Sequence, residues 1–300
     1  MAKILRPKRY LGQNFLIDQN ILDLIVESAE LSLDDIIIEI GSGTGSLTQK
    51  LARSSSKVIA IELDKNLFSI LISECKGKNI VPICADVLEL SFKDLINGIG
   101  QAPIIKIIGN LPYYITTPIL LKILDESLFL PIKTALVMVQ KEVAMRIIAS
   151  PGVKDYGSLS IAIGYRSKAR IVKYVSANCF YPKPKVDSAI IKLDLLDKPS
   201  VELEDERLFF QIIRAAFQYR RKTLRNAVLL ANGSGDIHSS SFSLNRTMSC
   251  LGSLSKKPEV INITTTALDN AMRSLNLDPR IRGENLSISE FADLANNIRS

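Results

Sequence analysis

The first two-thirds of the chain alternates short apolar runs with segments of helical period, and this pattern restricts the fold most. Residues 46–55 and 65–76 carry apolar side chains at the spacing of an amphipathic helix. Short, wholly apolar strands between such helices indicate βαβ units and a parallel sheet covered on both faces. We therefore predict an α/β fold with strands at 35–41, 57–64, 79–86, 104–110 and 134–140.

The pattern changes near Asp197. Before it, residues 158–166, 169–175 and 188–196 also read as strands. Residues 197–206 resemble a linker, and the Gly/Ser-rich stretch 231–243 a surface loop. Helical patterns occupy 207–230, 264–275 and 287–298. We expect two domains: residues 1–197, with a basic N-terminal arm, and a small helical domain of residues 198–300.

Charge and composition limit the kinds of partner and of functional site that this chain can have. The net charge of +7 favours an acidic partner such as nucleic acid. We find no apolar run of about 18 residues and no signal-peptide pattern, so we expect a cytoplasmic protein without a membrane span. His238 is the only histidine, and Cys75, Cys84, Cys179 and Cys250 lie far apart, which disfavours a metal site or a Ser-His-Asp triad. No heptad pattern is present, and we expect a monomer.

Glycines follow the first strand as Gly41, Gly43 and Gly45. They allow a tight turn and a close approach of a ligand to the backbone. A dinucleotide fingerprint would place its third glycine at position 46, which is Ser46. The spacing suits an adenine-nucleoside cofactor without a bridging pyrophosphate, such as S-adenosylmethionine.

Carboxylates end the next two strands. The Glu62 carboxylate can accept hydrogen bonds from both ribose hydroxyl groups, and Asp86 can accept one from an adenine amino group. A single glycine-rich turn is often only structural, and Asp86 alone can be a helix N-cap. Three such strand ends at one sheet edge are better explained by a cofactor site.

The fourth strand ends in Asn110, Leu111, Pro112 and Tyr113. An amide oxygen and a backbone carbonyl can accept the two hydrogens of an exocyclic base amine, which stabilises the charge that develops during methyl transfer. Pro112 would hold the turn rigid, and Tyr113 offers a face for stacking the base. Phe180 could close the base slot opposite Tyr113. A proline turn with core tyrosines, and a core Phe180, are the structural alternatives.

Together these motifs resemble the ribosomal RNA adenine N6,N6-dimethyltransferases, of the small-subunit type associated with kasugamycin sensitivity. The resemblance runs from KRYLGQNFLID (8–18) through GNLPYYITTPIL and FYPKPKVDSAIIKL to FQYRRKTLRNAV (217–228) and RGENLSISEFADLAN (282–296). Residues 231–258 match poorly, and we assign them no role. Ser42 stands where proline is common, and Ala85 replaces the usual glycine before Asp86.

This resemblance implies a class I S-adenosylmethionine-dependent methyltransferase fold, a Rossmann-like, mostly parallel seven-stranded sheet whose last strand is antiparallel. It implies dimethylation of two adjacent adenosines in the 3′-terminal hairpin of 16S rRNA within the assembling small (30S) subunit, with a role in its maturation. It implies that S-adenosylmethionine contacts Asn14, Leu16, Gly41, Glu62, Asp86 and Asn110.

Basic residues form three groups. We expect the helical domain to bind RNA through Arg214, Arg220, Arg221, Lys222 and Arg225, with Arg214, Arg221 and Arg225 on one helix face. The other groups are Lys3, Arg6, Lys8 and Arg9, and Lys168, Arg170, Lys173, Lys183 and Lys185. A solvated surface is the usual role of such runs.

Several other functions remain open. A large-subunit rRNA methyltransferase and a DNA or protein N-methyltransferase would share the chemistry, and a non-catalytic ribosome assembly factor could share the fold. Intact Glu62, Asp86 and Asn110 favour catalysis. A dehydrogenase is disfavoured by Ser46, which breaks the fingerprint.

Overall fold

The computed structural model describes residues 13–75, 79–97, 104–233 and 263–298. The chain divides into two compact units. The sheet unit comprises Met1–Ala144 and Lys168–Asp197, and the helical unit comprises Met145–Ser167 and Lys198–Ser300. A boundary thus falls at Asp197, but residues 145–167, which the sequence pattern places in the first domain, belong to the helical unit.

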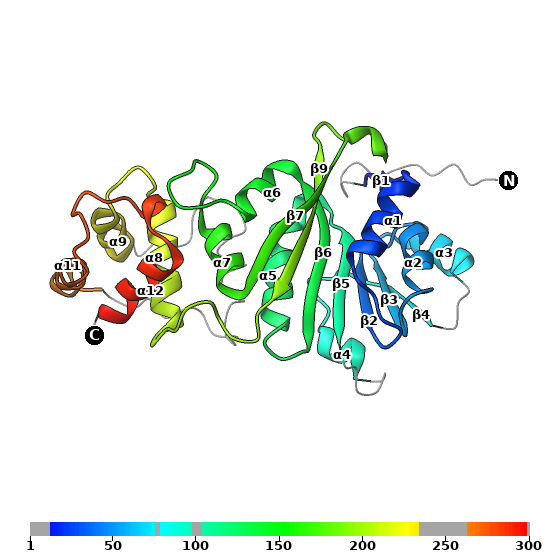
Figure 1. The fold of residues 1–300 in the computed structure, drawn as a ribbon, viewed down its shortest axis with the longest axis horizontal. Coiled ribbons are helices and arrows are strands. Elements are labelled where there is room, and N and C mark those ends of the chain that lie inside the picture. Colours follow the sequence, from blue (N-terminus) through cyan, green and yellow to red (C-terminus); the bar gives the residue numbers. More distant parts are fainter. Residues whose placement is uncertain (1–12, 76–78, 98–103, 234–262, 299–300) are drawn as a thin grey trace. The chain divides into compact units, whose positions relative to one another are not determined.

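The sheet unit is built on a seven-stranded sheet with the strand order β4-β3-β2-β5-β6-β9-β7 (Figure 1). Neighbouring strands from β4 to β6 are parallel, and β9 runs antiparallel to β6. The strands are β2 (Ile36–Ile40), β3 (Lys57–Glu62), β4 (Ile80–Cys84), β5 (Ile105–Asn110), β6 (Ile132–Gln140), β7 (Ser167–Val175) and β9 (Ser188–Leu195). The predicted mostly parallel sheet with an antiparallel last strand is confirmed.

Helices cover the sheet because its central strands are apolar on both faces. β2 and most of β3 are buried along their length. Helices α1 (Gln19–Ser28), α2 (Ser46–Leu51) and α3 (Lys65–Glu74) share one core cluster with strand residues such as Ile37, Val58 and Ile108. Figure 1 shows α5 (Thr116–Glu126) on the other side of the sheet, and α4 (Phe92–Ile96) and α6 (Lys141–Ile147) complete the helices that follow its strands.

Helix α1 and the segment before it are held against the rest of the sheet unit at two places. Strand β1 (Phe15–Leu16) pairs antiparallel with β8 (Phe180–Tyr181). At the other end of α1, the buried Lys106 Nζ donates to the carbonyl oxygens of Ala29 and Glu30, at 3.1 and 2.5 Å. The buried Lys192 Nζ lies 2.8 Å from Glu30 Oε1. These contacts fix α1, and with it residues 13–18, next to the carboxyl edge of the sheet.

The helical unit differs from the sequence prediction in two respects. Residues 158–166 form helix α7 (Ser158–Arg166) and not a strand. Its residues are buried nearly all round, so they lack the polar face that reveals a helix in a sequence. The Tyr165 ring lies 5.5 Å from the rings of both Phe209 and Phe210, and these contacts place α7 in this unit.

The predicted helix 207–230 is two helices, α8 (Glu206–Gln218) and α9 (Leu224–Gly233), separated by a turn. Helices α11 (Thr265–Ser274) and α12 (Ile288–Asn297) agree with the predictions for 264–275 and 287–298. Most of the predicted loop 231–243 lies outside the described residues, as do the basic residues of the N-terminal arm, His238 and Cys250.

Candidate functional site

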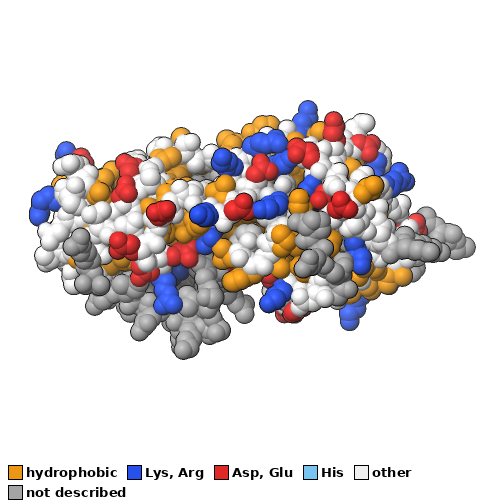
Figure 2. Space-filling view, turned by 60° about the horizontal axis from the view of Figure 1, so that its bottom comes forward, with side chains coloured by type: hydrophobic (Ala, Val, Ile, Leu, Met, Phe, Trp, Pro, Cys, Tyr) orange, Lys and Arg blue, Asp and Glu red, His pale blue; other side chains and the backbone are white. Residues whose placement is uncertain are grey.

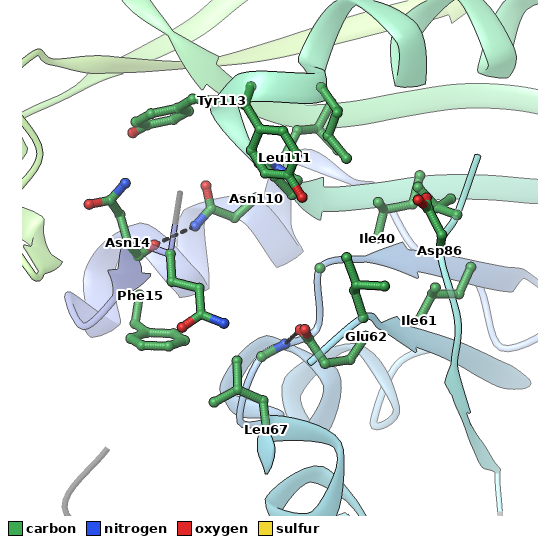
Figure 3. A pocket seen from close by; sticks show the side chains of 18 of the residues that line it. Asn14, Phe15, Ile40, Ile61, Glu62, Leu67, Asp86, Asn110, Leu111 and Tyr113 are labelled. Carbon is green, nitrogen blue, oxygen red and sulfur yellow. Dashed lines mark hydrogen bonds between the residues drawn. The ribbon is translucent and has the colours of Figure 1, made fainter. Parts of the chain in front are cut away.

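A pocket opens where β2, β3, β4 and β5 end, so that residues distant in sequence meet at one edge of the sheet (Figure 3). Four strand ends and the N-terminal segment form its wall. It is lined by Gln13, Asn14, Phe15, Ile40, Gly41, Gly43, Ile61, Glu62, Leu63, Leu67, Ala85, Asp86, Val87, Asn110, Leu111, Pro112, Tyr113, Tyr114 and Ile115.

The glycine turn after β2 holds the acidic residue at the end of β3. Gly41 and Gly43 both have a positive φ, a backbone conformation that residues with a side chain rarely adopt. The Gly43 N–H donates to Glu62 Oε2 at 2.8 Å, and the Asp64 N–H donates to Glu62 Oε1 at 2.8 Å. A Cβ on Gly41 would lie only 3.0 Å from the Asn110 carbonyl oxygen. The turn therefore fixes the position of the Glu62 carboxylate and brings the backbone of Gly41 close to that of Asn110.

The two carboxylates of the pocket differ in their surroundings. Burial raises the pKa of Glu62, while the two backbone N–H groups oppose that shift. Asp86 Oδ1 accepts the Leu88 N–H at 2.9 Å and so stabilises a turn, but it is not a helix N-cap, because α4 begins later with Ser91 as its cap. Asp86 nevertheless lines the pocket on the side shared with Ile40 and Ile61 (Figure 3).

The Asn110 side chain is oriented by the N-terminal segment. Its Nδ2 donates to the Asn14 carbonyl oxygen at 2.9 Å, across 96 residues of sequence (Figure 3). Because the amide nitrogen is engaged there, the amide oxygen is the atom left to accept a hydrogen bond from a ligand. Gln13 Nε2 donates to Asp64 Oδ2 at 2.9 Å, which ties the same segment to the residue that holds Glu62.

The NLPY turn is fixed by hydrogen bonds on both sides. The Leu111 N–H donates to the Met138 carbonyl of β6 at 3.1 Å. Thr116 Oγ1 donates to the Pro112 carbonyl at 3.0 Å. The Tyr113 hydroxyl lies 2.7 Å from Ser188 Oγ. The turn therefore presents Asn110 and Tyr113 to the pocket from a rigid backbone.

Two predicted site residues lie elsewhere. The Phe180 side chain is 3% exposed and belongs to the core cluster, so it does not close a slot opposite Tyr113 in this structure. Its pairing with Leu16 across β1 and β8 explains this position. Leu16 itself packs against the same core cluster and does not line the pocket. All the other predicted cofactor and catalytic residues line it.

Sequence reasoning missed several lining residues. Tyr114 is 50% exposed, and its pKa is raised by burial and, to a lesser extent, by Asp86 and Glu62. Its place next to Tyr113 was a usable signal. Gln13 and Phe15 reach the pocket only through long-range pairing of the N-terminal segment, which no local pattern reveals.

The predicted RNA-binding residues have different environments in the helical unit. The prediction that Arg214, Arg221 and Arg225 share one helix face is wrong, because α8 ends at Gln218 and Arg225 lies on α9. Arg220 Nε donates to Glu284 Oε2 at 2.6 Å. Arg225 makes two hydrogen bonds to Asp269, at 2.6 and 2.9 Å.

Among the described residues, no acidic side chain forms an ion pair of this kind with Arg214, Arg221 or Lys222. Arg221 and Lys222 are exposed. Arg214 is partly buried, burial lowers its pKa, and its Nε has no hydrogen-bond partner among the described residues. Elsewhere, Figure 2 shows a face on which basic and acidic side chains are interspersed.

Two features are absent from the part of the chain that the structure describes. None of the helices in that part of the chain is both long and apolar enough to cross a membrane. Within the same residues, no three His, Cys, Asp or Glu side chains gather in a way that could hold a metal ion.

The sheet order, the antiparallel β9 and the glycine-carboxylate pocket define a class I methyltransferase. Residues 4–250 match the model of the family described as ribosomal RNA adenine dimethylase. The chain therefore belongs to the ribosomal RNA adenine dimethylase family, which confirms the resemblance seen in its motifs, and it is an rRNA adenine dimethyltransferase.

Known proteins support this assignment. The chain is 41% identical over 294 residues to the ribosomal RNA small subunit methyltransferase A of Clostridium acetobutylicum, covering 98% of this chain and 94% of the relative. It is 44% identical over 290 residues to the protein of the same name from Alkaliphilus oremlandii, covering 96% and 90%.

Solved structures agree with the fold. The crystal structure of a dimethyladenosine transferase from Plasmodium falciparum has a TM-score of 0.70 at 28% identity and covers 93% of this chain and 95% of its own. The crystal structure of the 23S rRNA methyltransferase ErmE has a TM-score of 0.64 at 22% identity, with coverages of 95% and 99%. The latter likeness concerns the fold alone.

Proposed function

We propose that this protein uses S-adenosylmethionine to dimethylate the N6 atoms of two adjacent adenosines in the 3′-terminal hairpin of small-subunit rRNA, in a cytoplasmic subunit that is still assembling. The observation that carries the proposal is the orientation of Asn110, whose amide nitrogen is bound to Asn14 and whose oxygen remains available to the pocket. The small-subunit relatives at 41% and 44% identity support this choice of RNA.

The pocket residues suit S-adenosylmethionine. Glu62 has a carboxylate fixed by two backbone N–H groups and suited to ribose hydroxyls. Ile61, Leu67 and Val87 supply apolar walls of the kind that holds an adenine ring. Close approach of Gly41 to Asn110 leaves no space for a side chain there. When bound, the cofactor supplies an electrophilic methyl group.

The chain's own residues act on the accepting amine. The lone pair of an adenine N6 is delocalised into the ring, which makes the amine a poor nucleophile. Asn110 Oδ1 and the Leu111 carbonyl would accept its two hydrogens and stabilise the positive charge that develops on nitrogen. Pro112 has no N–H that could compete, and the Tyr113 ring would stack on the base.

The target base must leave its helix or come from a loop, at a cost of a few kcal/mol. Stacking on Tyr113 would offset part of that cost. Phosphate contacts would come from the exposed Arg221 and Lys222, with Arg214 available as a third cation. Arg220 and Arg225 are held by Glu284 and Asp269, so we assign them mainly to the structure of the helical unit. We expect the protein to act as a monomer.

The test is a transfer assay with labelled S-adenosylmethionine on small subunits, large subunits and protein-free 16S rRNA from cells that lack this modification. Nucleosides are identified by mass spectrometry. We expect N6,N6-dimethyladenosine in the small subunit alone. Label in large subunits would contradict the choice of substrate, and binding to small subunits without transfer would identify a non-catalytic assembly factor.

A further inference from the structure

The segment 176–188 connects the two parts of the site that face the target base. Its strand β8 pairs with β1, and the Ile17 N–H donates to the Cys179 carbonyl at 2.9 Å. Asp187 Oδ1 accepts the Ala177 N–H at 3.0 Å and closes the segment on itself. The next residue, Ser188, begins β9 opposite Gln140 of β6. One segment thus touches both the N-terminal strand next to Asn14 and the ring of Tyr113.

Ser188 contacts Tyr113 from inside the protein. Its side chain is 0% exposed, and its Oγ lies 2.7 Å from the Tyr113 hydroxyl. The backbone end of the tyrosine is held as well, because Thr116 Oγ1 donates to the Pro112 carbonyl. A ring anchored at its hydroxyl and at its backbone keeps one orientation. Ser188 does not line the pocket, so it can reach the substrate only through Tyr113.

We propose that Ser188 is a positioning residue that fixes the ring plane of Tyr113 on which the target adenine stacks. The inference rests on the proposed function and adds a residue that it does not use. Stacking and transfer both require the base to lie at a defined angle and distance from the methyl donor, and small displacements from that geometry are costly. A tyrosine free to turn about its side-chain bonds would present the base less often in the reactive position.

The alternative is that Ser188 has only a packing role as the buried first residue of β9. A double-mutant cycle separates the two roles, because an effect exerted through the tyrosine hydroxyl must vanish once that hydroxyl is gone. Four proteins are needed: wild type, Ser188→Ala, Tyr113→Phe and the double variant. For each, kcat and KM are measured with small subunits and with S-adenosylmethionine. The affinity for S-adenosylhomocysteine and the midpoint of unfolding show whether each variant is folded and still has an intact cofactor site.

We expect Ser188→Ala and Tyr113→Phe each to lower kcat/KM for small subunits about tenfold, with the KM for S-adenosylmethionine within about twofold of wild type. The double variant should be no less active than either single variant. If Ser188→Ala does not fold, Tyr113→Phe removes the same hydrogen bond from the other side and must show the same loss.

Unchanged activity in either folded single variant would overturn the inference. So would a multiplication of the two losses in the double variant, which would show that Ser188 acts independently of Tyr113. A wild-type protein that transfers no methyl groups to small subunits would overturn the proposed function and this inference with it, so the two failures are distinguishable.

Discussion

At the scale of single residues, strand β2 carries a buried carboxyl group that does not line the pocket but affects stability. Glu39, on β2, is 1% exposed and accepts a hydrogen bond from Thr48 Oγ1. Burial raises the pKa of Glu39 from 4.5 to about 7. The folded protein therefore holds a proton that the unfolded chain releases near its ordinary pKa. Its stability contribution is present at low pH and is lost as the pH rises to about 7.

This linkage gives a prediction. Between about pH 4.5 and 7, the free energy of unfolding should fall by on the order of 3 kcal/mol because of Glu39. Glu39→Gln should reduce that decline, measured by urea unfolding at several pH values. The matched control is Glu89→Gln, which removes an exposed carboxylate. Equal pH dependence in wild type and Glu39→Gln would contradict this account.

Tyr114 is the second residue at this scale. It lines the pocket within electrostatic range of Asp86 and Glu62, the residues assigned to the cofactor. Tyr114→Ala should weaken S-adenosylhomocysteine binding about tenfold, in the range of one aromatic stacking contact. Calorimetric titration measures this. Tyr174→Ala is the control, since Tyr174 is similarly exposed at 48% and does not line the pocket. Equal affinities in the two variants would exclude the contact.

At the scale of elements, the position of Asn110 depends on how closely β2 and β5 approach. Gly109 lies opposite Ile40 in this parallel pair, and a Cβ there would lie 2.3 Å from the Ile40 carbonyl oxygen. The Cβ is fixed by the backbone of residue 109 and the oxygen belongs to the backbone of Ile40, so the clash cannot be relieved without disturbing the strand pairing. Gly109→Ala should therefore lower the free energy of unfolding by about 1–3 kcal/mol and reduce transfer.

Denaturant unfolding and the transfer assay measure the two effects of Gly109→Ala. Gly157→Ala is the control, because a Cβ there meets no atom within 4 Å. Wild-type stability in Gly109→Ala would show that the strands tolerate a wider spacing than the structure indicates.

The elements also show which features a sequence can reveal. Parallel strands place their carboxyl ends at one edge, so the positions of Gly41, Glu62, Asp86 and Asn110 at strand ends were enough to predict that they meet. Helix α7 could not be distinguished from a strand, because burial on nearly all sides removes the helical period. The burial of Phe180 could not be read from the sequence, because its pairing with Leu16 joins segments far apart in the chain.

At the scale of the whole molecule, RNA binding should depend on cations that the fold leaves exposed. Reversing Arg221 and Lys222 to Glu should weaken binding to small subunits and reduce the slope of log affinity against log salt by about 1 per lost phosphate contact. The control reverses Lys198 and Arg207, which are exposed cations of the same unit. A salt series measured by filter binding compares them, and equal slopes would remove Arg221 and Lys222 from the interface.

The most direct test of the central claim is the amount of N6,N6-dimethyladenosine formed per small subunit by wild type and by Asn110→Ala, with S-adenosylhomocysteine affinity measured on both. The account predicts two dimethylated adenosines per subunit for wild type, and no detectable transfer by Asn110→Ala despite nearly unchanged cofactor affinity. Near-normal transfer by Asn110→Ala would contradict the assigned chemistry, and no dimethyladenosine with wild type would contradict the function itself.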